Sequence, residues 1–215
     1  MSTIAFASIC PHPPIILPSV GSKEDRETAK KTIESLELLG KKLIEVGPQS
    51  IIISSPHEDW GFNVPLHFLA PDFKGEIIKY VTGEESPAFH FEEGRKTYKE
   101  TIAQEPASNK IALIASGDLS HALKEEGPYS FHPQGPKFDQ DLIKYLKNKD
   151  IDSLMKLDED YPEAGECGLR SICFILGILE ESKISYQPEI LSYEGPWGVG
   201  YLVANFKLPS WAPKK

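Results

Sequence analysis

Short apolar runs alternate with amphipathic stretches along most of this chain. Residues 3–10 and 51–53 form two apolar runs, and between them hydrophobic residues recur at helical spacing until Gly47 and Pro48. Two buried strands joined by one helix form a β-α-β unit, in which the strands are parallel and the crossover is right-handed. The pattern therefore predicts an α/β fold.

The remaining sequence continues this alternation. Further strands are expected at residues 64–69, 76–81, 110–115, 186–193 and 199–206, and further helices at 89–103, 151–157, 165–181 and from Pro136 onward. No internal repeat, low-complexity tract or linker interrupts residues 1–215. We therefore expect a single domain with a central, mostly parallel or mixed sheet flanked by helices.

The charge and cysteine content narrow the classes of partner and compartment. The chain has 215 residues and a formal net charge of −9, whereas proteins that bind nucleic acids or anionic membranes present basic surfaces. We expect neither partner. The three cysteines form no CxxC pair, which indicates a reducing compartment. The N-terminus lacks the basic start of a signal peptide, and no apolar run approaches the ~20 residues of a membrane span, so we expect a cytoplasmic protein.

Three of the six histidines occupy one topological position. His12 follows the first predicted strand, His57 the second, and His121 the strand at 110–115. In open α/β sheets, ligands bind beyond the carboxyl ends of the strands, and imidazole is both the commonest metal ligand and an acid or base near neutral pH. A loop histidine that stands alone is usually a surface residue, but three at equivalent strand ends predict a shared metal-centred site. By contrast, His90 is expected on a helix surface.

A metal centre also needs an anionic ligand, and three residues are candidates. Glu166 and Cys167 lie where the helix at 165–181 begins, and Glu194 lies in a turn between the last two strands. Each has an ordinary alternative, because the helix dipole favours a first-turn carboxylate, turns favour polar residues, and a cysteine packs well in a core. A thiolate is nevertheless stabilised at a helix N-terminus, which makes Cys167 a candidate soft ligand.

Five segments carry a resemblance to a known family. They are SICPHPP at 8–14, ISSPH at 53–57, SGDLSH at 116–121, EAGECGLR at 163–170 and SYEGPWGVGY at 192–201. By their order and spacing, which extend over nearly the whole chain, the sequence resembles the catalytic LigB-type subunit of class III extradiol ring-cleavage dioxygenases. It is also similar to the related Memo-like proteins.

The resemblance implies an α/β fold with a central sheet and a non-haem Fe(II) centre. Members of the dioxygenase family hold iron with two histidines and a glutamate, which leaves positions open for catechol and O₂. His12 and His57 match the two histidine ligands. His121 matches the catalytic histidine, an acid or base beside the metal whose ordinary pKa suits that role.

The third ligand is where this sequence departs from the family. When the glycines at 165 and 168 are aligned, Arg170 takes the position of the ligand glutamate, and arginine cannot bind a cation. Glu166 lies on the same helical face and is favoured as the replacement. Cys167 lies near the place where Memo-like proteins have a cysteine that joins the metal, and Glu194 is the third option. Residues 58–115 also lack the Asp-His-Gly motif that shapes the dioxygenase pocket, so the substrate does not transfer.

Three functions follow in order of preference. The first is an Fe(II)-dependent dioxygenase that acts on a catechol-type aromatic with O₂, for which Tyr129, Trp60 and Trp197 are candidate stacking residues. The second is a Memo-like metal-binding or redox protein without ring cleavage, and the third is a zinc hydrolase. Iron is the preferred cofactor, with zinc and copper as alternatives. An enzyme of this type also allows for a homo-oligomer.

Overall fold

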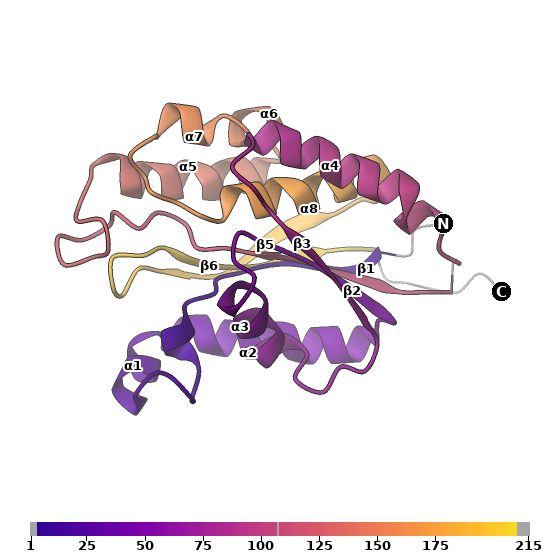
Figure 1. The fold of residues 1–215 in the computed structure, drawn as a ribbon, viewed down its shortest axis with the longest axis horizontal. Coiled ribbons are helices and arrows are strands. Elements are labelled where there is room, and N and C mark those ends of the chain that lie inside the picture. Colours follow the sequence, from indigo (N-terminus) through magenta and orange to yellow (C-terminus); the bar gives the residue numbers. More distant parts are fainter. Residues whose placement is uncertain (1–3, 107, 210–215) are drawn as a thin grey trace.

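A six-stranded mixed sheet forms the centre of the molecule. The computed structural model describes residues 4–106 and 108–209. The strands are β1 (Ile4–Cys10), β2 (Ser50–Ser55), β3 (Glu76–Val81), β4 (Ile111–Ser116), β5 (Gln187–Glu194) and β6 (Tyr201–Lys207). They lie in the order β3-β2-β4-β1-β6-β5, with β1 to β4 parallel, β6 antiparallel to β1, and β5 antiparallel to β6 (Figure 1). The predicted α/β fold with a mixed sheet is confirmed.

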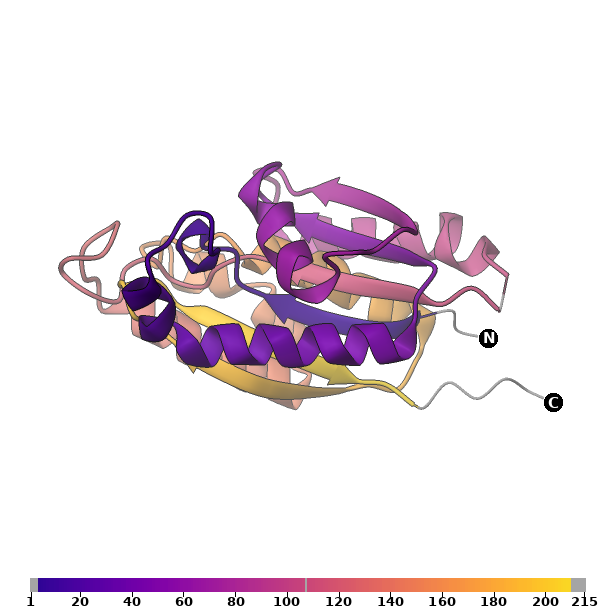
Figure 2. The same ribbon diagram turned by 90° about the horizontal axis from the view of Figure 1, so that it is seen from below.

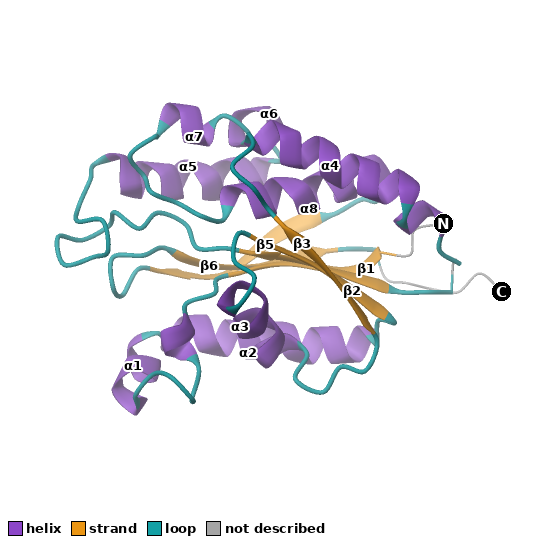
Figure 3. Ribbon diagram, viewed as in Figure 1, coloured by secondary structure: helices purple, strands orange, loops and turns teal. Residues whose placement is uncertain are grey.

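Helices cover both faces of the sheet (Figure 3). One face carries α1 (Lys23–Thr28), α2 (Lys30–Val46) and α3 (Trp60–Leu69); the other carries α4 (Pro87–Glu100), α5 (Gln134–Asn148), α6 (Ile151–Leu154), α7 (Leu157–Asp160) and α8 (Leu169–Ser182). Single turns of 3₁₀ helix at Pro14–Ile16 and Ile102–Gln104 complete the elements. Within the described ranges, no helix is long and apolar enough to cross a membrane.

Strand periodicity divides the interior into two hydrophobic clusters. In β2, Ile51 and Ile53 pack on the side of α2, whereas Ile52 packs on the side of α8, because successive side chains of a strand point to opposite faces. Figure 2 shows α2 lying along the underside of the sheet. On the other side, α8 is enclosed by the sheet and α4, which explains why it is apolar on nearly every face. Added Cβ atoms at Gly94 or Gly177 would overlap the opposite backbone, so glycine permits this close approach.

Three local predictions are wrong. The helix expected at 165–181 is α8, which begins at Leu169, so Glu166 and Cys167 lie in the loop before it. Residues 64–69 form the end of α3 and not a strand, because a short apolar run does not distinguish a buried helix from a strand. His90 is 1 % exposed and not a surface residue. Its Nδ1 lies 3.1 Å from the hydroxyl of Tyr80, which lies on the edge strand β3.

Candidate metal centre

The loops beyond β1, β2 and β4 meet the segment that leads into α8. They bring potential metal ligands into two groups, His12–His57–Cys167 and Asp118–His121–Cys167, whose ligand atoms lie within 4.8 Å of one another. Cys167 belongs to both groups. The three predicted histidines therefore lie at one edge of the sheet, and a cysteine sulfur lies between them.

The tautomer of His12 follows from its hydrogen bonds. Its ring is 2 % exposed, and Nδ1 lies 3.0 Å from the Ser116 hydroxyl. That hydroxyl has one proton, which it donates to the Gly61 carbonyl, so it accepts the proton on His12 Nδ1. Nε2 then carries no proton, and it lies 3.4 Å from Cys167 Sγ. Burial, with the nearby His57 as a second cause, lowers the pKa of His12 to about 3, which keeps it a neutral ligand at neutral pH.

Proline in α3 leaves the Gly61 carbonyl available for this chain of hydrogen bonds. In an α-helix, the N–H of residue 65 would bond to the carbonyl of residue 61, but Pro65 has no N–H. The freed carbonyl accepts from Ser116, and Ser116 accepts from His12. Pro65 in α3 thus helps to orient the candidate ligand His12, through the Gly61 carbonyl and the Ser116 hydroxyl.

His57 is half-buried, whereas His12 is buried. Its ring centroid lies 5.2 Å from that of His12 and 5.1 Å from that of Trp60. The His57 backbone N–H donates to the Ser55 hydroxyl at 3.1 Å. A Cβ at Gly61 would overlap the Ser55 hydroxyl, so the start of α3 packs closely against this turn.

Cys167 is held by backbone contacts from the loop after β4. The Asp118 N–H donates to its Sγ at 3.3 Å, and His121 Nε2 lies 3.9 Å from the same sulfur. A Cβ at Gly117 would overlap the Cα of Gly168, so only glycine allows the two segments to meet. Burial raises the pKa of the Cys167 thiol, and the Asp118 and Glu166 charges raise it further. A bound cation has the opposite effect and favours the thiolate.

Asp118 is a site residue that the sequence reasoning missed. Its side chain is buried, and Oδ1 accepts the backbone N–H of His12 at 2.9 Å. Burial raises the pKa of this carboxyl to about 6. Burial also lowers the pKa of His121, while the Asp118 charge acts in the other direction. The available signal was its place three residues before His121 and two residues after the end of a buried strand.

The two predicted glutamate ligands have other partners. Glu166 accepts the Leu169 N–H at 2.6 Å and lies 3.3 Å from the Arg170 guanidinium, which also pairs with Asp158. Glu194 accepts both the N–H and the hydroxyl of Thr32. Neither glutamate belongs to a ligand group among the described residues. The structure brings Cys167 to the histidines and does not bring Glu166 or Glu194.

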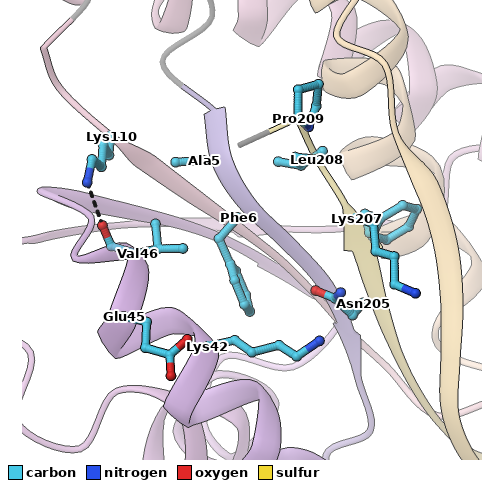
Figure 4. A pocket seen from close by; sticks show the side chains of 11 residues that line it. Ala5, Phe6, Lys42, Glu45, Val46, Lys110, Asn205, Lys207, Leu208 and Pro209 are labelled. Atoms are coloured by element: carbon cyan, nitrogen blue, oxygen red, sulfur yellow. Dashed lines mark hydrogen bonds between the residues drawn. The ribbon is translucent and has the colours of Figure 1, made fainter. Parts of the chain in front are cut away.

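A cavity of about 480 Å³ lies at the opposite end of the strands (Figure 4). Its lysines already have partners, because Lys42 and Lys207 both pair with Glu189 and Lys110 donates to the Val46 carbonyl. The described side chains of this cavity include no histidine, cysteine or aspartate. This cavity therefore offers fewer potential metal ligands than the edge that carries His12, His57 and Cys167.

Comparisons with known proteins identify a relative in sequence and a solved structure of similar fold. The chain is 30% identical to Protein CA_C1420 of Clostridium acetobutylicum over 269 aligned residues, which cover 93% of the chain and 56% of that relative. The chain thus spans just over half the length of the curated relative it matches. A crystal structure of the uncharacterized protein JW3007 from Escherichia coli K12 superposes with a TM-score of 0.62 at 17% identity, covering 94% of this chain and 99% of that one. This likeness shows the shared fold.

A family model described as the catalytic LigB subunit of aromatic ring-opening dioxygenase matches residues 58–204. The match includes Asp118, His121 and Cys167, and it begins directly after His57. Because it covers more than half of the chain, this protein belongs to the LigB family.

Proposed function

We propose that this protein is a metal-dependent oxidoreductase in which His12, His57 and Cys167 hold the ion. The observation that carries the proposal is the meeting of these three ligand atoms within 4.8 Å, with the unprotonated Nε2 of His12 facing Cys167 Sγ. Two imidazoles and a thiolate suit iron, copper and zinc. A bound iron or copper ion would supply redox chemistry, with O₂ and an aromatic substrate as the reactants that the LigB family implies.

In this proposal, His121 is the acid or base at the metal centre. Burial lowers its pKa, so the imidazole is neutral at neutral pH and able to accept a proton from a substrate hydroxyl. Its Nε2 lies 3.9 Å from Cys167 Sγ, which places it beside the ligand group. The nearby Asp118 charge favours the protonated imidazole, and this stabilises His121 after it takes the proton.

The position of Cys167 favours a second candidate function. Its sulfur lies near both His12 and His121, and in this proposal a thiolate replaces the carboxylate ligand that the resemblance to the dioxygenases implies. Thiolates select softer ions, copper(I) among them. The second candidate is a Memo-like metal-binding or redox protein that does not cleave aromatic rings.

One experiment separates the two functions. The protein is purified anaerobically, its metal content is measured, and O₂ uptake with a panel of catechols is followed after Fe(II) loading. Uptake together with ring-opened product supports the dioxygenase. Absence of uptake with every catechol, combined with tight copper or zinc binding, excludes it and supports the second candidate.

The ligand set is tested separately by metal content. We expect His12→Ala and Cys167→Ala to lose bound metal, while Glu166→Gln retains it. His67→Ala serves as the matched control, because His67 is exposed on α3 away from the ligand groups. Retention of metal by Cys167→Ala with loss by Glu166→Gln would reverse the assignment of the third ligand.

A further inference from the structure

A second recess lies beside the metal centre. Its volume is about 390 Å³, and two loops form it, the loop that follows β4 and the loop that precedes α8. The loop after β4, which the sequence colours of Figure 1 identify, projects from the same end of the molecule as the turn between β5 and β6. The lining residues are Tyr129, Phe131, His132, Pro162, Glu163 and Gly165. We call this recess the aromatic cavity.

Hydrogen bonds donated by two backbone N–H groups hold the walls of the aromatic cavity in place. The His132 N–H donates to the Ala122 carbonyl at 3.0 Å, and the Glu163 N–H donates to Gln134 Oε1 at 2.8 Å. Between the two aromatic residues, Ser130 adopts a left-handed conformation with φ of 58°. Such a conformation is uncommon for a residue other than glycine and marks a defined turn. The hydrogen bonds and the turn at Ser130 therefore define the shape of the cavity.

Tyr129 joins the aromatic cavity to the metal centre. Its ring centroid lies 5.5 Å from that of His121. The ring also rests on Gly165, where an added Cβ would come within 2.7 Å of Tyr129 Cδ2. Gly165 has φ of 62° and lies two residues before Cys167. A molecule in the cavity would therefore contact Tyr129, whose ring lies next to that of His121.

The lining of the cavity favours a cation. Tyr129 and Phe131 are 64% and 44% exposed, so their rings are available to a ligand. Glu163 supplies a carboxylate, and neither lysine nor arginine is among the described lining residues. His132 Nδ1 accepts the Gln134 N–H at 3.3 Å, so this ring nitrogen already has a partner within the loop. Aromatic faces beside a carboxylate are the arrangement that binds ammonium groups through cation–π attraction.

We propose that the aromatic cavity binds the ammonium group of a small molecule, with Tyr129 and Phe131 as its aromatic walls and Glu163 as its counter-ion. That this molecule is the substrate of the metal centre rests on the function proposed above. The binding itself depends only on the cavity.

The test compares choline with its neutral carbon isostere, which has the same shape without the charge. Binding to the full chain is measured by calorimetry and by shifts of tyrosine NMR signals, in metal-free and in metal-loaded protein. We expect choline to bind at least about tenfold more tightly than the isostere. Tyr129→Leu and Glu163→Gln should each weaken choline binding several-fold, whereas Tyr129→Phe, which keeps the ring, should not.

Phe89→Leu and Glu100→Gln are matched controls, because both residues are exposed on α4 away from the cavity. Equal affinity for choline and the isostere, or unchanged binding in both Tyr129→Leu and Glu163→Gln, would overturn the proposal. Metal content is measured in every variant, so loss of the metal centre is distinguished from loss of the cavity. If the protein binds choline but consumes no O₂, the cavity proposal is supported. Only the proposed oxidoreductase function is then contradicted.

Discussion

The Ser116 hydroxyl lies 3.0 Å from Nδ1 of His12 and determines which nitrogen of that ring faces the metal site. Ser116 ends β4 and His12 follows β1, so the parallel pairing of these two strands brings them together. The relationship depends on a third group, the Gly61 carbonyl, which takes the hydroxyl proton. Without it, Ser116 could equally donate to Nδ1, and the proton of the imidazole would then lie on Nε2.

Ser116→Ala should weaken metal binding more than it weakens the fold. The variant leaves His12 Nδ1 without a partner, and loss of such an orienting contact reduces metal affinity by about 10–100-fold. Competition with a chelator measures the affinity, and chemical denaturation measures stability. Ser54→Ala is the control, because Ser54 is also buried and also donates to a backbone carbonyl, that of Ser171. Equal metal affinity in the two variants would contradict the role assigned to Ser116.

Pro65→Ala should also weaken metal binding, while the helix itself becomes no less stable. Alanine restores an N–H that competes with Ser116 for the Gly61 carbonyl, and it removes a residue that disfavours the helix interior. Chelator competition and thermal unfolding of the metal-free protein separate the two effects. Pro87→Ala, at the first position of α4, removes a proline that blocks no helical hydrogen bond. A several-fold loss of affinity confined to Pro65→Ala is the expected result.

Strand ends were the most informative feature of the sequence. Parallel strands bring their carboxyl ends to one edge, so placing His12, His57 and His121 after apolar runs was enough to predict that they meet. The same reasoning did not single out Asp118. Loop acids are common, and its role depends on a hydrogen bond from the His12 backbone, which no local pattern reveals.

The sequence could not decide between Glu166 and Cys167 as the third metal ligand, for a different reason. Both residues lie in the loop before α8, which begins at Leu169, and a loop has no regular periodicity that fixes which side chain faces the histidines. The direction is set by the contact of Gly117 with Gly168, which joins segments distant in sequence. That contact turns Cys167 toward the histidines and leaves Glu166 with Arg170.

Gly117→Ala should destabilise the fold and abolish metal binding together. The added methyl would overlap Gly168 Cα, which is backbone and cannot move aside as a flexible side chain can. Overpacking of this kind costs about 1–3 kcal/mol, and it displaces the segment that carries Cys167. Denaturant unfolding and metal content are measured on the same preparation.

Gly47→Ala provides the contrast for this experiment. Gly47 has φ of 60° at the end of α2, so alanine there is strained, but the nearest atom to its Cβ is 3.8 Å away. We expect a loss of stability of about 1 kcal/mol with normal metal content. Normal metal content in Gly117→Ala as well would show that the approach of the two glycines does not position Cys167.

Asp139 should make the stability of the protein fall as the pH rises toward neutrality. This buried carboxyl accepts the Ser120 N–H and the Tyr193 hydroxyl, and burial raises its pKa from 3.8 to about 7. Between these values the folded state keeps the proton and the unfolded state loses it, so its contribution is present at low pH and is lost as the pH rises. The slope is at most about 1.4 kcal/mol per pH unit. Asp139→Asn cannot titrate, so its unfolding free energy, measured by denaturant titration from about pH 4 to pH 8, should lack this decline. Parallel curves for the variant and the unmodified protein would mean that Asp139 is already ionised in the fold.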